Sequence, residues 1–126
     1  MNQATFEPDS ASVRAVRVFV ASAMDLPEDL EATVALLVSE LAVNSVLHAR
    51  TTYQVAVDAA FGRVRISVTD TNPRLPVVKF HSLEAATGRG LRLVQSLADR
   101  WGVDSHEQGK TVWFEFDLET GEARSA

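Results

Sequence analysis

The hydrophobic pattern of this 126-residue chain changes its period close to Thr51. Before that point, apolar residues recur every three or four positions, which is typical of helices that bury one face. From Tyr53 onward they alternate with polar residues, which is typical of half-buried strands. Two helices followed by neighbouring strands favour an α+β fold in which the helices cover one face of a sheet.

Breaks in the two patterns define the individual elements. We expect a short edge strand at 4–8, helices at about 10–24 and 27–49, strands at 53–61 and 64–70, a loop at 71–87, a helix at about 88–98, and strands at 101–105 and 111–118. Gly62 and Arg63 are expected to form a tight hairpin turn. Short turns between strands imply a mixed, mainly antiparallel sheet. The predicted fold is a two-layer α/β sandwich with three helices on one face.

The composition narrows the class of protein. The length and a hydrophobic content of 46% fit a single domain over 1–126, with a core at about 11–118 and a frayed tail at 120–126. Cysteine is absent, which excludes disulfides and thiolate catalysis. A net charge of −5 disfavours direct nucleic-acid binding. We find no apolar run of membrane-spanning length and no secretory signal, so we expect a cytoplasmic protein.

Three polar residues interrupt the apolar stripe of the second helix. Glu40, Asn44 and His48 follow one another at a spacing of four residues, on one helical face. The apolar residues on the same half are Leu36, Leu37, Leu41, Val43 and Leu47. A buried carboxylate without a partner costs several kcal/mol. We therefore expect a metal, cation, water or ligand beside Glu40, with a network that anchors the helix or a loop as the structural alternative.

Two further positions point to a ligand. Asp70 continues the inward line of the strand at 64–70, although an aspartate of the following turn is the structural alternative. Gly88-Arg89-Gly90-Leu91 opens a helix after a long loop, a context in which backbone N–H groups bind phosphate. An acid and an amide on one helix, a distant aspartate and a glycine-opened helix together describe a nucleotide site.

These motifs resemble the GHKL superfamily of ATP-binding domains. Within it, the chain is most similar to anti-sigma factor serine kinases of the RsbW type and their actinobacterial ATP-binding relatives. The resemblance covers about 11–118. It associates 37–49 with the asparagine box, 68–70 with the aspartate box, 88–91 with the second glycine box and 109–115 with the last motif.

The resemblance implies a Bergerat-type fold that binds ATP and Mg²⁺. It implies that Asn44 coordinates Mg²⁺, that Glu40 is the general base, and that Asp70 accepts a hydrogen bond from the adenine amine. It also implies that Thr111 supports Asp70, and that 71–87 forms the nucleotide lid. The implied phosphate-binding residues are Gly88, Arg89, Gly90 and Leu91. The implied partners are an anti-sigma factor antagonist of the STAS type, whose serine is phosphorylated, a sigma factor, and a second copy in a homodimer.

The chain departs from the family pattern at the first glycine box, where Asn72 and Arg74 stand in place of glycines. Two hypotheses follow. The chain is a Mg²⁺·ATP-dependent serine protein kinase, or it is a non-catalytic partner-binding module in which ATP is a structural or sensing ligand. Simple alternation also places Thr111 on the non-core face of the last strand. Trp113 is on that face too, where it marks a partner surface or is covered by the chain itself.

Overall fold

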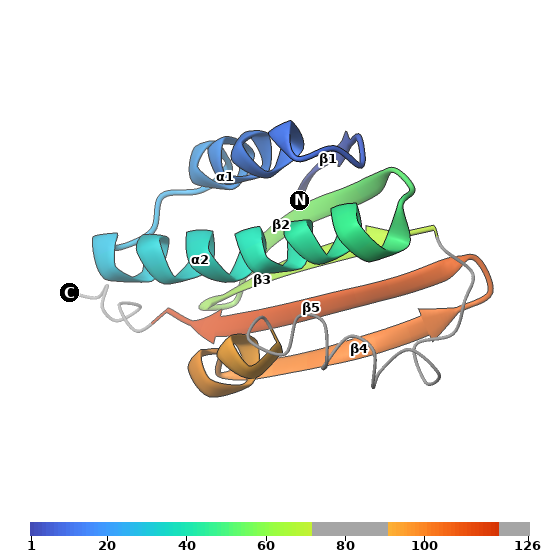
Figure 1. The fold of residues 1–126 in the computed structure, drawn as a ribbon. Helices are drawn as coiled ribbons and strands as arrows, with labels where there is room; N and C mark the ends of the chain where they lie inside the picture. Colours follow the sequence, from blue (N-terminus) through green and yellow to red (C-terminus); the bar gives the residue numbers. More distant parts are fainter. Residues whose placement is uncertain (72–90, 119–126) are drawn as a thin grey trace.

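A computed structural model describes residues 1–71 and 91–118. The elements in chain order are β1 (Asn2–Phe6), α1 (Ala11–Ala23), α2 (Glu28–Asn44), the π-helical turn η1 (Ser45–Ala49), β2 (Tyr53–Ala60), β3 (Arg63–Asp70), a helix at 91–97, β4 (Arg100–His106) and β5 (Gly109–Asp117). The described strands form one sheet in the order β1-β2-β3-β5-β4, and each neighbouring pair is antiparallel. Figure 1 shows the helices on one face of this sheet. The predicted α+β sandwich is confirmed.

The hairpin of β2 and β3 forms the centre of the sheet. Its buried aliphatic side chains are Val55, Val57, Val64, Ile66 and Val68. The two turn residues, Phe61 and Gly62, have φ angles of 52° and 75°, as the two-residue turns that match strand twist require. The turn was expected at Gly62 and Arg63, with Phe61 on the strand face. That placement was wrong, because Phe61 lies in the turn and is fully exposed.

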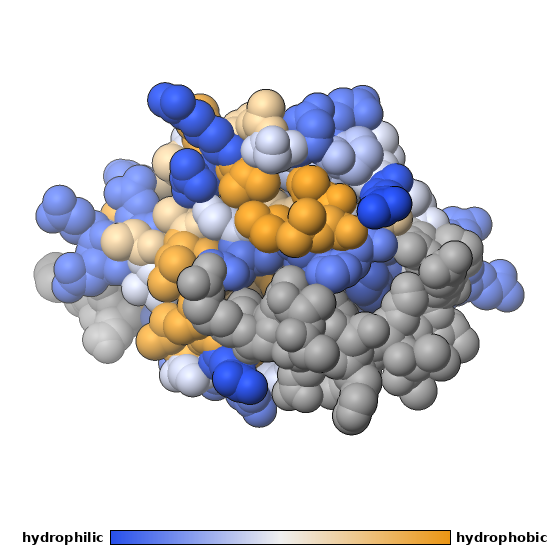
Figure 2. All heavy atoms as spheres, in the orientation of Figure 1, coloured by the Kyte–Doolittle hydropathy of each residue, from blue (hydrophilic) through white to orange (hydrophobic). Residues whose placement is uncertain are grey.

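Helix α2 packs against β3 and supplies much of the core. Its buried residues are Val34, Leu37, Val38, Leu41, Ala42 and Asn44. The expectation that Leu36, Val43 and Leu47 share this buried side was wrong, since their exposed fractions are 43%, 36% and 56%. Figure 2 shows hydrophobic side chains gathered on the helical face of the molecule. Because the helix is apolar over most of its circumference, its sequence pattern does not single out the side that meets the sheet.

Helix α2 and the turn η1 together form a continuous helical stretch, Glu28–Ala49, of 22 residues. Its length and mean hydropathy of 1.6 are also those of a membrane-spanning helix. The expectation that no segment approaches such a span was therefore wrong as a statement about composition. In this fold the stretch is a core helix, since Leu37, Val38 and Leu41 pack in the cluster between helices and sheet.

Helix α1 is joined to the sheet through Tyr53, the first residue of β2. The buried hydroxyl groups of Tyr53 and Ser12 are 2.5 Å apart and share a hydrogen bond. Phe6 of β1 stacks on the Tyr53 ring, with 5.7 Å between the ring centroids. Burial raises the pKa of the Tyr53 phenol above its usual value, while the hydrogen bond with Ser12 lowers it in part. These contacts hold β1, α1 and β2 together at one edge of the fold.

Candidate functional site

The last turns of α2 carry the first part of the predicted site. Asn44 is the final residue of α2 and is 7% exposed, and Glu40, one turn earlier, is half-buried. His48 is exposed, so the expectation that it shares the buried stripe was wrong. The helix continues from Asn44 into η1, and such π-helical turns often occur at functional sites.

Asp70 ends β3 on the inward face of the sheet and is 4% exposed. Its carboxylate is held by a lysine that the sequence analysis did not single out. The Nζ atom of Lys110 donates to Oδ2 of Asp70 at 2.6 Å, and Lys110 is itself 6% exposed. The signal was present in the sequence, because Lys110 lies two positions before the inward-facing Val112 of the last strand.

Thr111 lies on the opposite face of the sheet from Asp70. It pairs in register with Thr69, and their Oγ1 atoms are 2.8 Å apart. The pairing of β3 with β5 continues in steps of one residue from Arg63 to Asp70. No bulge therefore turns the hydroxyl inward, and the structure does not bring the Thr111 and Asp70 side chains together.

Gly109 places the start of β5 directly against the end of β3. Its φ angle is +153°, and a Cβ atom there would overlap the backbone carbonyl oxygen of Asp70. Only glycine fits such an approach without a backbone shift. Leu91 is the first described residue of the helix at 91–97 and is buried in the core. Gly88, Arg89, Gly90 and the loop at 72–87 lie outside the described residues.

The topology gathers these groups at one end of the molecule. Tyr53, Asp70 and Lys110 lie side by side across β2, β3 and β5. Strand β2 begins shortly after η1, so the carboxyl end of the long helix lies at the same end of the sheet (Figure 1). The fold thus places Asn44 and the buried Asp70–Lys110 pair at the same end, between helix and sheet.

The donor set suits a magnesium ion that arrives with phosphates. Among residues 1–71 and 91–118, no three His, Asp or Glu side chains gather to hold a metal ion. Mg²⁺ commonly takes one or two protein oxygens and completes its shell with substrate phosphates and water. The Asn44 amide oxygen can be such a protein ligand, and the Glu40 carboxylate lies one helical turn away.

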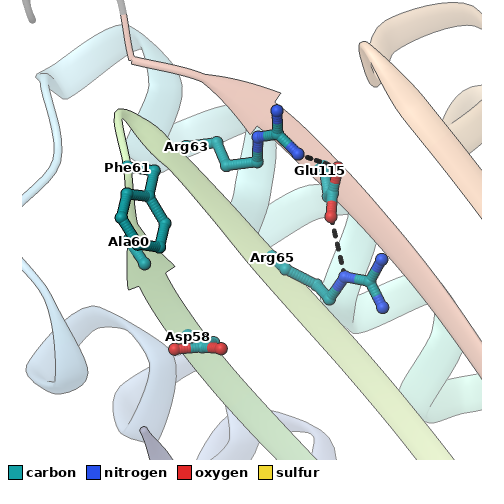
Figure 3. Close-up of a pocket in the computed structure, with 6 residues that line it drawn as sticks. All are labelled: Asp58, Ala60, Phe61, Arg63, Arg65 and Glu115. Carbon is teal, nitrogen blue, oxygen red and sulfur yellow. Dashed lines mark hydrogen bonds and ion pairs between the residues drawn. The ribbon is translucent and has the colours of Figure 1, made fainter.

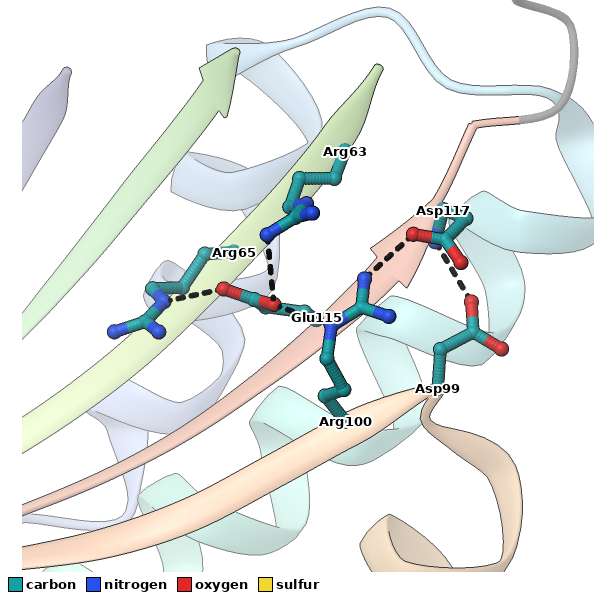
Figure 4. Close-up of polar contacts among 6 residues, drawn as sticks. All are labelled: Arg63, Arg65, Asp99, Arg100, Glu115 and Asp117. Atoms are coloured by element: carbon teal, nitrogen blue, oxygen red, sulfur yellow. Dashed lines mark hydrogen bonds and ion pairs between the residues drawn. The ribbon is translucent and has the colours of Figure 1, made fainter. Parts of the chain in front are cut away.

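The outer face of the sheet carries a separate polar hollow. It has a volume of about 440 Å³ and is lined by Asp58, Ala60, Phe61, Arg63, Arg65 and Glu115 (Figure 3). Arg65 and Arg100 each donate through Nε to Glu115 at 2.8 Å, and Arg100 also bridges to Asp117 (Figure 4). The contacts with Arg100 and Arg65 hold the pKa of the Glu115 carboxyl below its usual value.

Trp113 lies on this outer face, as the alternation predicts, and the chain itself covers it in part. The Arg65 guanidinium is 4.0 Å from the centroid of its ring. A Cβ atom on Gly102 would lie 2.7 Å from the ring. The indole is thus held between the arginine and the glycine. The outer face therefore carries a network of ion pairs, and it lies on the opposite side of the sheet from Asp70.

Comparisons with known proteins give the family. The family described as "Histidine kinase-like ATPase domain" matches residues 6–116. No curated protein matches the chain. The chain is similar to the histidine kinase domain of the Erythrobacter litoralis EL346 blue-light activated histidine kinase, with 24% identity and a TM-score of 0.60 over 77% of this chain and 48% of that one.

Two other solved structures share the fold. One is the Erythrobacter litoralis EL346 blue-light activated histidine kinase, with 22% identity and a TM-score of 0.63 over 79% of this chain and 34% of that one. The other is the catalytic domain of the histidine kinase ThkA, with 16% identity and a TM-score of 0.53 over 94% and 97%. The chain spans about half and about a third of the two Erythrobacter chains. Because the family match covers most of its length, this chain belongs to the histidine kinase-like ATPase domain family, of the GHKL type.

Proposed function

We propose that this domain binds Mg²⁺·ATP between α2 and the sheet and transfers the γ-phosphoryl group to a serine of a partner protein. The observation that carries the proposal is the pair Glu40 and Asn44. The two residues are one turn apart, one half-buried and one buried, at the end of the fold where Asp70 lies. Polar groups withdrawn from water on a core helix are expected to serve a ligand or a structural network.

Each residue has a distinct part in the proposed reaction. The Asn44 amide oxygen would hold Mg²⁺, and the bound ion would neutralise part of the phosphate charge. Asp70 contacts the base. The Glu40 carboxylate takes the proton of the serine hydroxyl group. At the same time the serine oxygen forms a bond to the γ-phosphorus. The bond from that phosphorus to the β–γ bridging oxygen breaks, and ADP leaves with the bond electrons.

The proposed substrate is an anti-sigma factor antagonist of the STAS type, with a sigma factor as a second partner. The support is the resemblance of the asparagine, aspartate and second glycine boxes to those of RsbW-type kinases. We propose that the chain acts in the cytoplasm as a homodimer. Phosphate binding by Gly88, Arg89, Gly90 and Leu91 belongs to the same proposal.

A non-catalytic module that holds ATP as a structural or sensing ligand is the second candidate. Two observations favour it. Lys110 already occupies one oxygen of the Asp70 carboxylate, and Asn72 and Arg74 replace the glycines of the first glycine box. In this account the chain regulates its partner by sequestering it, and nucleotide binding controls that association.

A transfer assay with Glu40→Gln separates the two functions. Labelled Mg²⁺·ATP is incubated with the chain and a STAS-type antagonist, and phosphoserine is followed. The kinase account predicts transfer by the native chain, and its loss in Glu40→Gln with nucleotide binding retained. Glu31→Gln, an exposed acid at the start of the same helix, is the matched control and should transfer normally. Nucleotide binding without transfer by the native chain would support the non-catalytic module.

A further inference from the structure

The buried pair of Lys110 and Asp70 lies inside the proposed nucleotide site. The two residues are direct neighbours across β3 and β5, and both face the helices. Their side chains are 7% and 5% exposed, and Nζ of Lys110 is 2.6 Å from Oδ2 of Asp70. A lysine this deeply buried is rare unless it is paired.

The backbone holds this pair in place. Gly109 leaves no room for a Cβ atom beside the carbonyl group of Asp70, so the strand that carries Lys110 lies directly against the end of β3. The register of the two strands is continuous up to Asp70 and Lys110. The ammonium therefore lies beside the carboxylate as a fixed part of the site.

The ammonium has more hydrogen-bonding capacity than the pair uses. A lysine ammonium has three N–H donors and no acceptor. Within the part of the chain that the structure describes, Asp70 is the hydrogen-bond partner of Lys110, and it takes one donor. Buried donors are nearly always satisfied in folded proteins. A ligand atom that accepts a hydrogen bond next to Asp70 would satisfy a second donor.

We propose that Lys110 sets the base preference of this site, by adding a cationic donor to the carboxylate that contacts the base. The inference rests on the proposed nucleotide binding at Asp70. A carboxylate alone accepts from the 6-amine of adenine, whereas it faces the O6 atom of a 6-oxo purine as one acceptor against another. With Lys110 beside it, the site offers both an acceptor and a donor. It therefore accepts a 6-oxo purine nucleotide as well as ATP.

The test compares Mg²⁺·ATP with Mg²⁺·ITP by calorimetric titration, because the two bases differ in the group at position 6 and in the proton at N1. The native chain should bind both, with dissociation constants within about tenfold of each other, which corresponds to about 1.4 kcal/mol. Lys110→Met removes the ammonium donor from beside the Asp70 carboxylate. In this variant the affinity for ITP should fall at least about tenfold relative to the affinity for ATP. Arg92→Met, which removes an exposed cation, should leave the ratio unchanged.

Removal of the lysine leaves a buried carboxylate without its cation, which can unfold the chain. Circular dichroism identifies that case, and Lys110→Gln then carries the test. Glutamine removes the charge and keeps one donor for Asp70. The ratio of the ITP and ATP dissociation constants should therefore shift in the same direction as in Lys110→Met, but by a smaller factor. If the ratio of the ATP and ITP dissociation constants is unchanged in a folded variant, the role of Lys110 is overturned. The proposed nucleotide site would not be affected by that result. Absence of binding by the native chain to either nucleotide would instead contradict the proposed function, and the base preference with it.

Discussion

Gly109 lies so close to the backbone carbonyl of Asp70 that no side chain fits between them. Its φ angle of +153° is in a region that other residues rarely adopt, and a Cβ atom would overlap the carbonyl oxygen. This approach joins the start of β5 to the end of β3, where the Asp70 carboxylate meets Lys110. The packing of two backbones thus determines where the most buried charges of the site lie.

Gly109→Ala is therefore expected to destabilise the fold by about 2 kcal/mol or more, through backbone strain and the overlap with Asp70. Gly62→Ala is the matched control. Gly62 also has a positive φ, of +75°, but has open space around it, so it should cost only about 1 kcal/mol. Urea unfolding of both variants measures the difference. Equal losses would show that the close approach adds nothing to the effect of the φ angle.

The sequence predicted the layers of this fold better than its faces. The alternation after Tyr53 and the helical period before Thr51 are patterns within single segments. Each segment therefore indicates its own secondary structure without reference to its neighbours. The side of α2 that meets the sheet was placed wrongly for Leu36, Val43 and Leu47. A helix that is apolar almost all round buries whichever side the sheet offers, so tertiary packing decides.

The contacts of the site depend on strand register, which no local pattern specifies. The alternation of the last strand placed Thr111 on the outer face correctly, against the role that the family resemblance implies for it. The Asp70–Lys110 pair needs β3 and β5 to align across a long stretch of intervening chain. The same holds for Glu115, whose arginine partners come from β3 and β4. The polar residues of these pairs were visible in the sequence, but their partners were not.

Glu115→Gln should change the acid stability of the protein. Contacts with Arg100 and Arg65 lower the pKa of Glu115 in the folded state. Their stabilisation is therefore present above the usual glutamate pKa of about 4.3 and is lost as the pH falls through the lower folded value. At about pH 7 the variant should be less stable by about 1–2 kcal/mol, and this difference should shrink towards about pH 3.

Urea unfolding at several pH values measures this prediction. Asp117→Asn is the control, because Asp117 also pairs with Arg100 but its side chain is 57% exposed. An exposed pair is screened by solvent, so this variant should lose clearly less stability than Glu115→Gln. If the loss of unfolding free energy in Glu115→Gln stays constant down to the lowest pH measured, the carboxylate charge does not stabilise the fold.

Tyr53→Phe should change stability at the alkaline end. Burial raises the pKa of Tyr53 in the folded state. The stability that depends on the neutral phenol is fully present below about pH 10 and is lost as the pH rises through the folded value. The variant should lack this alkaline loss. At neutral pH it should cost about 1 kcal/mol, because one buried hydrogen bond to Ser12 is removed.

The chain contains a single tyrosine, so phenolate absorbance reports Tyr53 alone. A spectrophotometric titration of the folded protein should show ionisation above the usual tyrosine pKa, and urea should return it to the usual value. Ionisation at the usual pKa in the folded protein would contradict the burial of this hydroxyl group.

Gly102→Ala should displace the Trp113 ring. The new Cβ atom would lie 2.7 Å from the ring, on a side chain that also contacts the Arg65 guanidinium. We expect a shift in tryptophan emission and a loss of about 1 kcal/mol or more from overpacking. Because Trp101 also fluoresces, the shift should disappear when the same change is made in a Trp113→Phe background. A shift that persists there would place the disturbance elsewhere.

The central claim is that a nucleotide binds between α2 and the end of the sheet. Calorimetric titration of Mg²⁺·ATP into the native chain and Asn44→Ala tests it most directly. Gln54→Ala, which removes an amide from β2 in register with Thr69, is the control. The account predicts binding by the native chain and by Gln54→Ala, and at least about tenfold weaker binding by Asn44→Ala. No binding by the native chain at millimolar nucleotide, or equal binding by a folded Asn44→Ala, would contradict it.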